Sequence, residues 1–63
     1  MTFGEAMERV AAGARVTKQE WGNTAIYLQA AGGFLKIFKP DAKEGKALLV
    51  SEGDLLGRDW MEI

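Results

Sequence analysis

The sequence predicts an α+β domain in which an N-terminal helix packs on a small antiparallel sheet, with a short helical turn before a C-terminal strand. Three patterns indicate this fold: a helix-capping motif at the first residues, alternating apolar and polar positions in the middle, and a second capping motif near the end. We expect residues 1–63 to form a single domain. Because a domain this small buries only about 60% of the surface of its unfolded chain, we also expect it to self-associate.

The first predicted element is a helix that begins at the stretch TFGE. Thr2 can accept a hydrogen bond from the backbone N–H of Glu5, and the Glu5 carboxylate can accept one from the N–H of Thr2. Apolar residues then recur every three or four positions, which gives the helix one apolar face (Phe3, Ala6, Met7, Val10 and Ala14). Gly13 is expected to end the helix in the left-handed conformation.

Three strands are expected next, at residues 15–19, 24–30 and 34–39. The turn-prone stretch WGN follows the first strand, and the stretch AGG predicts a hairpin between the second and third. Alternation places Ile26 and Leu28 on one face of the sheet. A half-exposed aromatic group of Tyr27, Phe34 and Phe38 lies on a face that one short helix need not cover, which indicates a subunit interface.

The C-terminal third carries a polar loop, a short strand, a helical turn and a last strand. Pro40 ends the third strand because it lacks a backbone donor, and the apolar run ALLV (residues 47–50) is expected as the fourth. Ser51 and Asp54 repeat the capping motif for a turn from Glu52 to Leu56, which Gly57 can stop. The ending RDWMEI is expected as an edge strand with Trp60 in the core.

The composition excludes several classes of function. Eight basic against nine acidic residues lack the positive excess that duplex nucleic acid requires. The chain has no histidine and no cysteine, so it lacks the commonest general base, the strongest nucleophile and the usual transition-metal ligands. We therefore expect no cofactor, no metal and no catalytic residue. The missing cysteines and the lack of a long apolar run favour a soluble protein of a reducing cytoplasm, away from membranes.

Trp21, in the stretch KQEWGN, has two interpretations. Large aromatic side chains are most often packed in the core, because each removes about 150–250 Å² from water. Alternatively, an indole beside Gly22, with Lys18 and Asn23 nearby, offers a ring for stacking, a cation for a phosphate and an amide for a base edge. The residues alone favour the core interpretation of Trp21, and they leave the nucleotide-pocket interpretation as an alternative.

The neighbouring candidates also have structural explanations. Lys18 would be a solvated strand residue, and Asn23 a turn former. Asp54 would cap the helical turn, and Phe3 would belong to the apolar face of the helix. No phosphate-binding glycine loop or metal cluster is present, so none of these residues identifies a function alone.

Together the stretches TFGEAMERVAAGARVTKQEWGN, IYLQA and SEGDLLGRDWMEI resemble the short phage domain of the Thoeris anti-defence family, second type. Its members share a Phe-Gly helix start, a Gly-x-x-Val-x-Arg-x-x-Trp turn, a strand with an aromatic-Leu pair and a closing Asp-Leu-Leu-x-x-Asp-Trp. The resemblance covers nearly the whole chain in the same order. The chain departs from the pattern at Lys18, where the family has arginine, and at LLV before Ser51, where many relatives carry an aromatic residue and a proline.

The resemblance implies a sponge that acts without catalysis. Such phage proteins bind the cyclic ADP-ribose-type signal of bacterial TIR enzymes in the cytoplasm of the infected host, and some relatives bind cyclic oligonucleotides of the CBASS defence. They assemble as homo-oligomers, usually tetramers, with pockets between subunits. By position, the implied ligand-binding residues are Phe3, Lys18, Trp21, Ser51 and Asp54, and Gly22 and Asn23 join them as neighbours of Trp21.

Two other hypotheses come from different classes. A protein-binding inhibitor would dock its exposed aromatic face on a host defence protein. An enzyme would degrade the signal with the carboxylates of Asp54 and Asp59. The chemical state of recovered nucleotide would separate the sponge from the enzyme.

Overall fold

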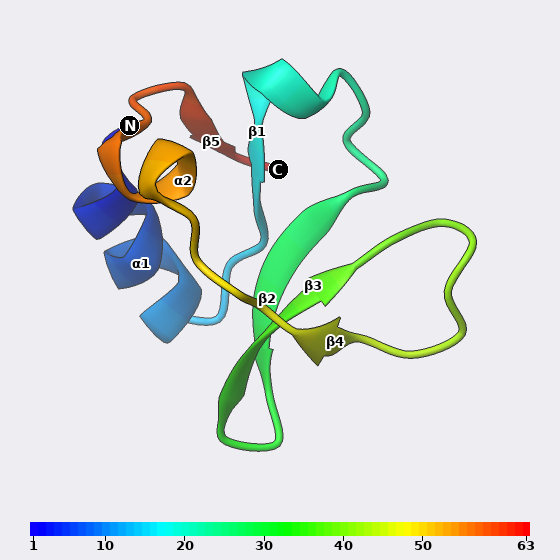
Figure 1. Cartoon of the computed structure of the whole chain (residues 1–63). Coiled ribbons are helices and arrows are strands. Elements are labelled where there is room, and N and C mark those ends of the chain that lie inside the picture. The colour runs from blue at the N-terminus through cyan, green and yellow to red at the C-terminus, as the bar shows by residue number, and fades with distance from the viewer.

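The computed structural model describes residues 1–63 and consists of one helix packed on a five-stranded antiparallel sheet, with a second, short helix (Figure 1). In chain order the elements are α1 (Phe3–Ala11), β1 (Val16–Lys18), a 3₁₀ turn η1 (Gln19–Trp21), β2 (Tyr27–Ala31), β3 (Phe34–Phe38), β4 (Lys46–Ala47), α2 (Glu52–Leu56) and β5 (Trp60–Glu62). The strand order is β4-β3-β2-β1-β5, and every neighbouring pair is antiparallel. The predicted α+β class and element order are therefore confirmed.

The capping motif at the start of α1 is formed as expected. The Glu5 N–H donates to Thr2 Oγ1 at 3.2 Å, and the Thr2 N–H donates to Glu5 Oε1 at 2.9 Å. These hydrogen bonds lower the pKa of the Glu5 carboxyl below its usual value. Gly13 is left-handed with φ of 96°, but the helix already ends at Ala11, so Ala14 lies beyond the apolar face to which the sequence assigned it.

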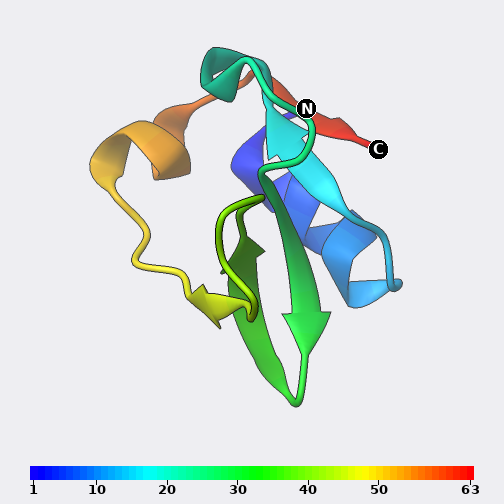
Figure 2. The same cartoon turned by 90° about the vertical axis from the view of Figure 1, so that its right-hand side faces the viewer.

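The hairpin between β2 and β3 follows the sequence closely. Gly32 and Gly33 both have positive φ, 61° and 84°, which matches the turn that joins twisted antiparallel strands through two residues. The two strands pair along their full length, from Tyr27 opposite Phe38 to Ala31 opposite Phe34. Figure 2 shows this hairpin extending away from both helices.

Most strands are shorter than predicted: β3 ends at Phe38 and β5 spans only Trp60–Glu62, while the larger differences lie in β1, β2 and β4. β1 stops at Lys18 because residues 19–21 turn into η1. β2 begins at Tyr27 instead of Thr24, since Asn23 Oδ1 accepts the Ala25 N–H at 2.9 Å and holds residues 23–25 in a turn. β4 contains only Lys46 and Ala47, so most of the run ALLV lies outside a strand.

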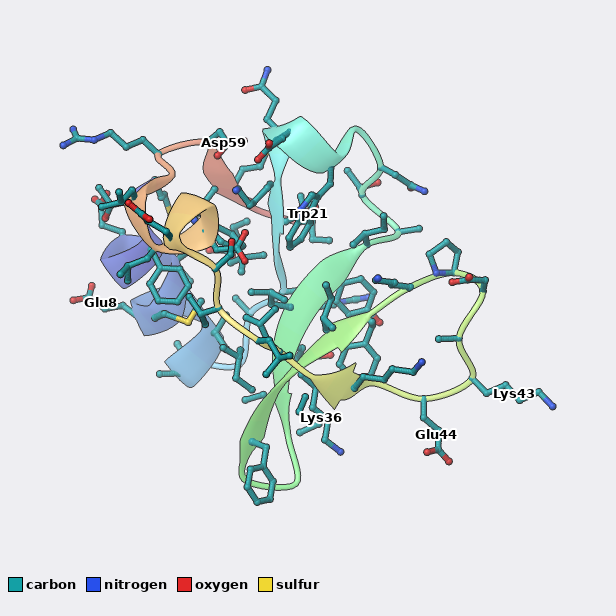
Figure 3. All side chains as sticks on the ribbon, viewed as in Figure 1. Glu8, Trp21, Lys36, Lys43, Glu44 and Asp59 are labelled. Carbon is teal, nitrogen blue, oxygen red and sulfur yellow. The ribbon has the colours of Figure 1, made fainter.

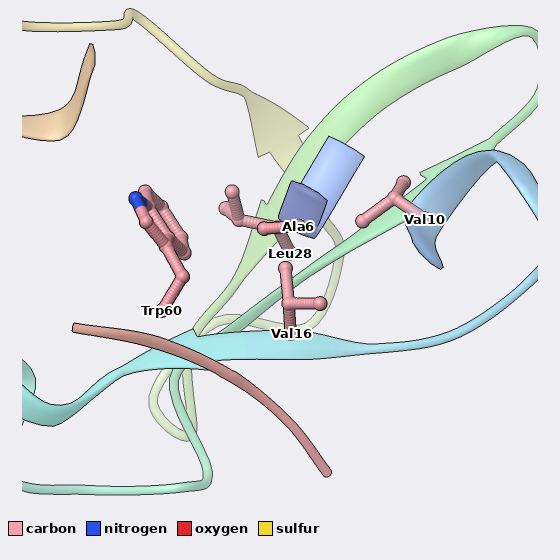
Figure 4. Close-up of a cluster of buried hydrophobic side chains, with 5 residues drawn as sticks. All are labelled: Ala6, Val10, Val16, Leu28 and Trp60. Carbon is pink, nitrogen blue, oxygen red and sulfur yellow. The ribbon is translucent and has the colours of Figure 1, made fainter. Parts of the chain in front are cut away.

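The core lies between α1 and the sheet, and Figure 4 shows its five buried apolar residues, Ala6, Val10, Val16, Leu28 and Trp60. Trp60 is 1% exposed, which confirms its predicted place in the core. Val16 and Leu28 face each other across the single paired position between β1 and β2. Beyond it the strands diverge, and Thr17 Oγ1 bridges them by donating to the Ile26 carbonyl at 2.6 Å.

Much apolar surface stays uncovered in the single chain. On the face opposite α1, Tyr27 stacks on Phe38 at 5.2 Å, and Phe34 is 69% exposed. The chain covers part of this face itself, because Gly45 lies against the Phe38 ring. A second exposed group surrounds α2 (Leu49, Val50, Leu55 and Leu56). The subunit interface at the aromatic face stays a prediction. Neither helix has the length and apolar character needed to cross a bilayer.

Substitution of one buried and one exposed leucine tests which residues contribute to the free energy of unfolding. Leu28 is fully buried and Leu49 is 89% exposed. Because Leu28→Ala opens a cavity in the core, we expect it to lower the free energy of unfolding by about 2–5 kcal/mol. Leu49→Ala should change it by less than about 0.5 kcal/mol. Urea denaturation monitored by circular dichroism measures both variants, and equal losses would place the core elsewhere.

Candidate functional site

The end of β1, the turn η1 and the helix α2 meet around Trp60. Pairing of β1 with β5 places Lys18 opposite Trp60. The helix α2 ends only a few residues before β5, so α2 lies near the same end of β1. The Lys18 Nζ atom lies 5.5 Å from the centre of the Trp60 ring, and the indole N–H of Trp60 donates to the Asp54 carbonyl at 3.2 Å. Segments far apart in sequence therefore form one cluster.

Lys18 is buried, so its interpretation as a solvated strand residue is wrong. Its side chain is 3% exposed, and its ammonium contacts Glu20 Oε2 at 2.9 Å and Asp54 Oδ1 at 3.4 Å. A buried ammonium requires such partners because it has left water. The two carboxylates differ in setting, since the Glu20 side chain is 71% exposed and that of Asp54 only 17%.

Asp54 caps α2 and pairs with Lys18 at the same time. Its N–H donates to Ser51 Oγ at 3.2 Å, and its Oδ2 atom accepts the Ser51 N–H at 3.2 Å. The other carboxylate oxygen contacts Lys18. The capping role expected from the sequence is confirmed. The Lys18 contact adds a long-range tie between α2 and β1 that the local sequence does not reveal.

Electrostatics favours the charged form of both partners. The hydrogen bond to Glu20 raises the pKa of Lys18, burial opposes this, and Asp54 adds to the rise, so the net value lies above 10.5. Burial raises the pKa of Asp54, but hydrogen bonds from Ser51 and the Lys18 contact outweigh it, so the net value lies below 3.8. One ammonium against two carboxylates leaves an excess of negative charge in the cluster.

Trp21 lies in η1, half-buried between the turn and the sheet (Figure 3). Its ring meets Trp60 edge to face, with centroids 5.5 Å apart and an interplanar angle of 83°. Phe3 contacts Trp60 in a similar way at 5.6 Å. Gly22 is left-handed with φ of 63° and lets the chain leave the turn directly after Trp21. Trp21 thus combines core packing on one side with exposure on the other.

A surface hollow of about 410 Å³ lies beside this cluster, lined by Thr17, Lys18, Gln19, Gly22, Asn23, Thr24 and Met61. Three of the seven sequence-predicted residues (Lys18, Gly22 and Asn23) line it, whereas Phe3, Trp21, Ser51 and Asp54 surround Trp60 behind it. Lys18 belongs to both groups. A larger hollow of about 810 Å³ lies within residues 37–49 and contains none of the predicted residues.

Several residues of this region were absent from the sequence-derived set: Trp60 and Glu20 in the cluster, and Thr17, Gln19, Thr24 and Met61 around the hollow. Trp60 was assigned only to the core, yet it contacts Phe3, Lys18 and Trp21. Glu20 pairs with Lys18. The signal for this pair would have been an acid two residues after a base, because residues i and i+2 of an extended chain lie on the same face. Thr17 lines the hollow from the middle of β1 and carries no signal that separates it from an ordinary strand residue.

The chain matches the family model of the Thoeris anti-defense 2-like domain (Tad2-like) over residues 1–63. This agrees with the family that the sequence resembles. No curated protein matches the chain.

The Lys18–Asp54 contact gives stability a defined pH dependence. Since the pKa of folded Asp54 lies below its ordinary value of 3.8, its contribution is present above that pH and is lost as pH falls through the folded value. We expect Asp54→Asn to lower the melting temperature at about pH 7, and the difference from wild type to shrink as the pH falls below 3.8. Thermal melts across this range measure the effect. Asp41→Asn, in an exposed loop, is the control, and a constant difference between wild type and Asp54→Asn would contradict the assignment.

Proposed function

The chain belongs to the Thoeris anti-defense 2-like family, and from this membership we propose that it binds a cyclic nucleotide immune signal and withholds it from its effector without breaking it. Membership implies a role against the Thoeris defence. The observation that carries the proposal is the half-buried Trp21, which packs on Trp60 in the cluster that holds the Lys18–Asp54 pair. Trp21 does not line the open hollow, but Lys18 and the next residue, Gly22, do. A cyclic ADP-ribose isomer is the proposed cargo, and a cyclic oligonucleotide is the second candidate.

The proposed pocket divides its tasks between the two groups of residues. The exposed side of Trp21 stacks on the base, which contributes about 1–3 kcal/mol. The amide nitrogen of Asn23 makes no hydrogen bond within the chain, so it can meet a base edge beside Gly22. Asp54 is suited to a ribose hydroxyl or base amine, with Lys18 and Ser51 holding its carboxylate and Phe3 supporting the aromatic cluster.

Tight capture requires more contacts than one chain offers. A nanomolar complex needs about 12 kcal/mol, far above what one stacked ring supplies. The hollow is small and open, and apolar side chains stay exposed on both the sheet face and α2. We therefore include in the proposal a homotetramer in which neighbouring subunits close the pocket, acting in the cytoplasm of the infected bacterium.

One observation favours a second candidate function. The exposed apolar group around α2 could instead receive a host defence protein, because such patches mark protein interfaces. The degrading enzyme has less support. Asp54 is held in its charged form by Lys18 and Ser51, and Asp59 is engaged by the Glu20 N–H. With its pKa lowered, Asp54 is not poised to donate a proton near neutral pH.

Release of bound nucleotide tests the function directly. Purified protein is mixed with cyclic ADP-ribose isomers and cyclic di- and trinucleotides, separated from unbound ligand, heat-denatured, and the released molecules are identified by mass spectrometry. We expect one intact cyclic nucleotide, because the site has no group poised to cleave it. An altered product would indicate an enzyme. An empty result across the panel would favour the protein-binding inhibitor.

Substitution of Trp21 tests the pocket. Because Trp21→Ala removes the stacking platform, we expect loss of capture with the fold and the oligomer retained, as measured by isothermal titration and analytical ultracentrifugation. Lys43→Ala is the control, since this side chain is exposed on the loop before β4, away from Trp21 (Figure 3). Loss of the oligomer in Trp21→Ala would show that Trp21 has a structural role instead.

A further inference from the structure

The 3₁₀ turn that carries Trp21 is fastened by Asp59. The Glu20 N–H donates to Asp59 Oδ2 at 2.9 Å, and the Gln19 N–H donates to the Asp59 carbonyl at 3.1 Å. Figure 3 shows Asp59 at the start of β5, on the side of η1. Residues 19 and 20 open the turn, so one distant residue satisfies the first two donors of η1.

No nearer side chain replaces this contact. The residue before the turn, Lys18, makes no capping hydrogen bond, because its ammonium can only donate and cannot accept the N–H groups of the turn. A three-residue turn forms a single internal hydrogen bond, here from the Gly22 N–H to the Gln19 carbonyl at 3.0 Å. The path of η1 therefore depends on a partner outside it, and Asp59 is that partner.

Asp59 and Trp60 both constrain the position of Trp21, one through its backbone and the other through its ring. Asp59 holds the backbone one residue before Trp21, and the Trp60 ring holds the Trp21 ring at 5.5 Å. The side chain of Asp59 is thus placed to set where the backbone of Trp21 lies, while Trp60 limits where its ring can turn. Loss of the carboxylate leaves the Glu20 N–H without its partner, so the turn is then held only by the Gln19 N–H bond to the Asp59 carbonyl and by the ring contact.

We propose that Asp59 is a positioning residue for nucleotide capture, which sets the plane of the Trp21 ring through the start of η1. The inference rests on the proposed function, because that function supplies the ligand. The geometry of Asp59, η1 and Trp60 is independent of it. The inference also gives Asp59 a role different from the acid–base role that the enzyme hypothesis assigns to it. Stacking energy depends on ring orientation, so a turned indole loses affinity even where the fold is intact.

The ring orientation can be measured without ligand. Two indoles at this distance give a coupled circular dichroism signal whose sign and size follow their mutual angle. We expect Asp59→Ala to weaken this signal, because the Glu20 N–H loses its partner and the start of η1 can shift. Asp59→Asn should keep it, since the amide oxygen still accepts the Glu20 N–H. Trp21→Phe defines the spectrum without coupling, and Asp41→Ala is the control for loss of an exposed aspartate.

Affinity is measured on the same proteins by titration with cyclic ADP-ribose and with a cyclic trinucleotide. We expect Asp59→Ala to bind about tenfold more weakly, with a melting temperature close to that of wild type, and Asp59→Asn to recover most of the affinity. Should Asp59→Ala fail to fold, Asp59→Glu keeps the charge but moves the carboxylate by one methylene, and it should weaken binding and change the spectrum together.

The outcomes separate the two proposals. Wild-type protein that binds neither probe nor any other nucleotide of the panel overturns the proposed function, and with it a role of Asp59 in capture. Wild type that binds while Asp59→Ala binds equally well, or keeps the coupled signal, overturns only the positioning role. Failure of Asp59→Asn to recover binding would also overturn it, because the hydrogen bond would then not be the cause.

Discussion

The structure depends on the burial of a single side chain, Trp60. Only seven of the 63 residues are buried, so one large indole supplies an unusual share of the core. Its ring contacts Phe3 of α1 and Trp21 of η1 and lies near the Lys18 ammonium of β1. Its N–H donates to the Asp54 carbonyl in α2. The elements that build the site are therefore the same elements that build the core.

This sharing has a consequence for the chemistry of the site. Lys18 leaves water to lie beside Trp60, and the loss of hydration is offset only because Glu20 and Asp54 accept its hydrogen bonds. Asp54 is in turn fixed by Ser51. Lys18 and Asp54 are thus held in place before any ligand arrives, which reduces the entropy that binding must overcome.

The sequence predicted what local contacts decide. The capping motifs at Thr2 and Ser51 and the glycine pair at 32–33 each act within four residues, and all three formed as expected. The early end of β1 and the late start of β2 arise from η1 and from the Asn23 turn. The alternation of apolar and polar residues does not predict these two boundaries, because residues 19–20 and 24–26 fit a strand pattern equally well. The contacts of Lys18 with Asp54 and of Glu20 with Asp59 span 36 and 39 residues, and no spacing rule reaches so far.

The charge of the cluster bears on selectivity under the proposed function. A bacterial cell holds abundant nucleotides with several charged phosphates, and a trap that accepted them would be filled before it met its signal. Glu20 and Asp54 together outweigh Lys18, so the cluster repels a dense negative charge more strongly than it repels a compact cyclic nucleotide. Affinity must then come from stacking and directed hydrogen bonds, and these depend on how firmly Trp21 and Asp54 are held. The buried Lys18–Asp54 pair, which by itself looks structural, contributes on this argument to the selectivity of the proposed pocket.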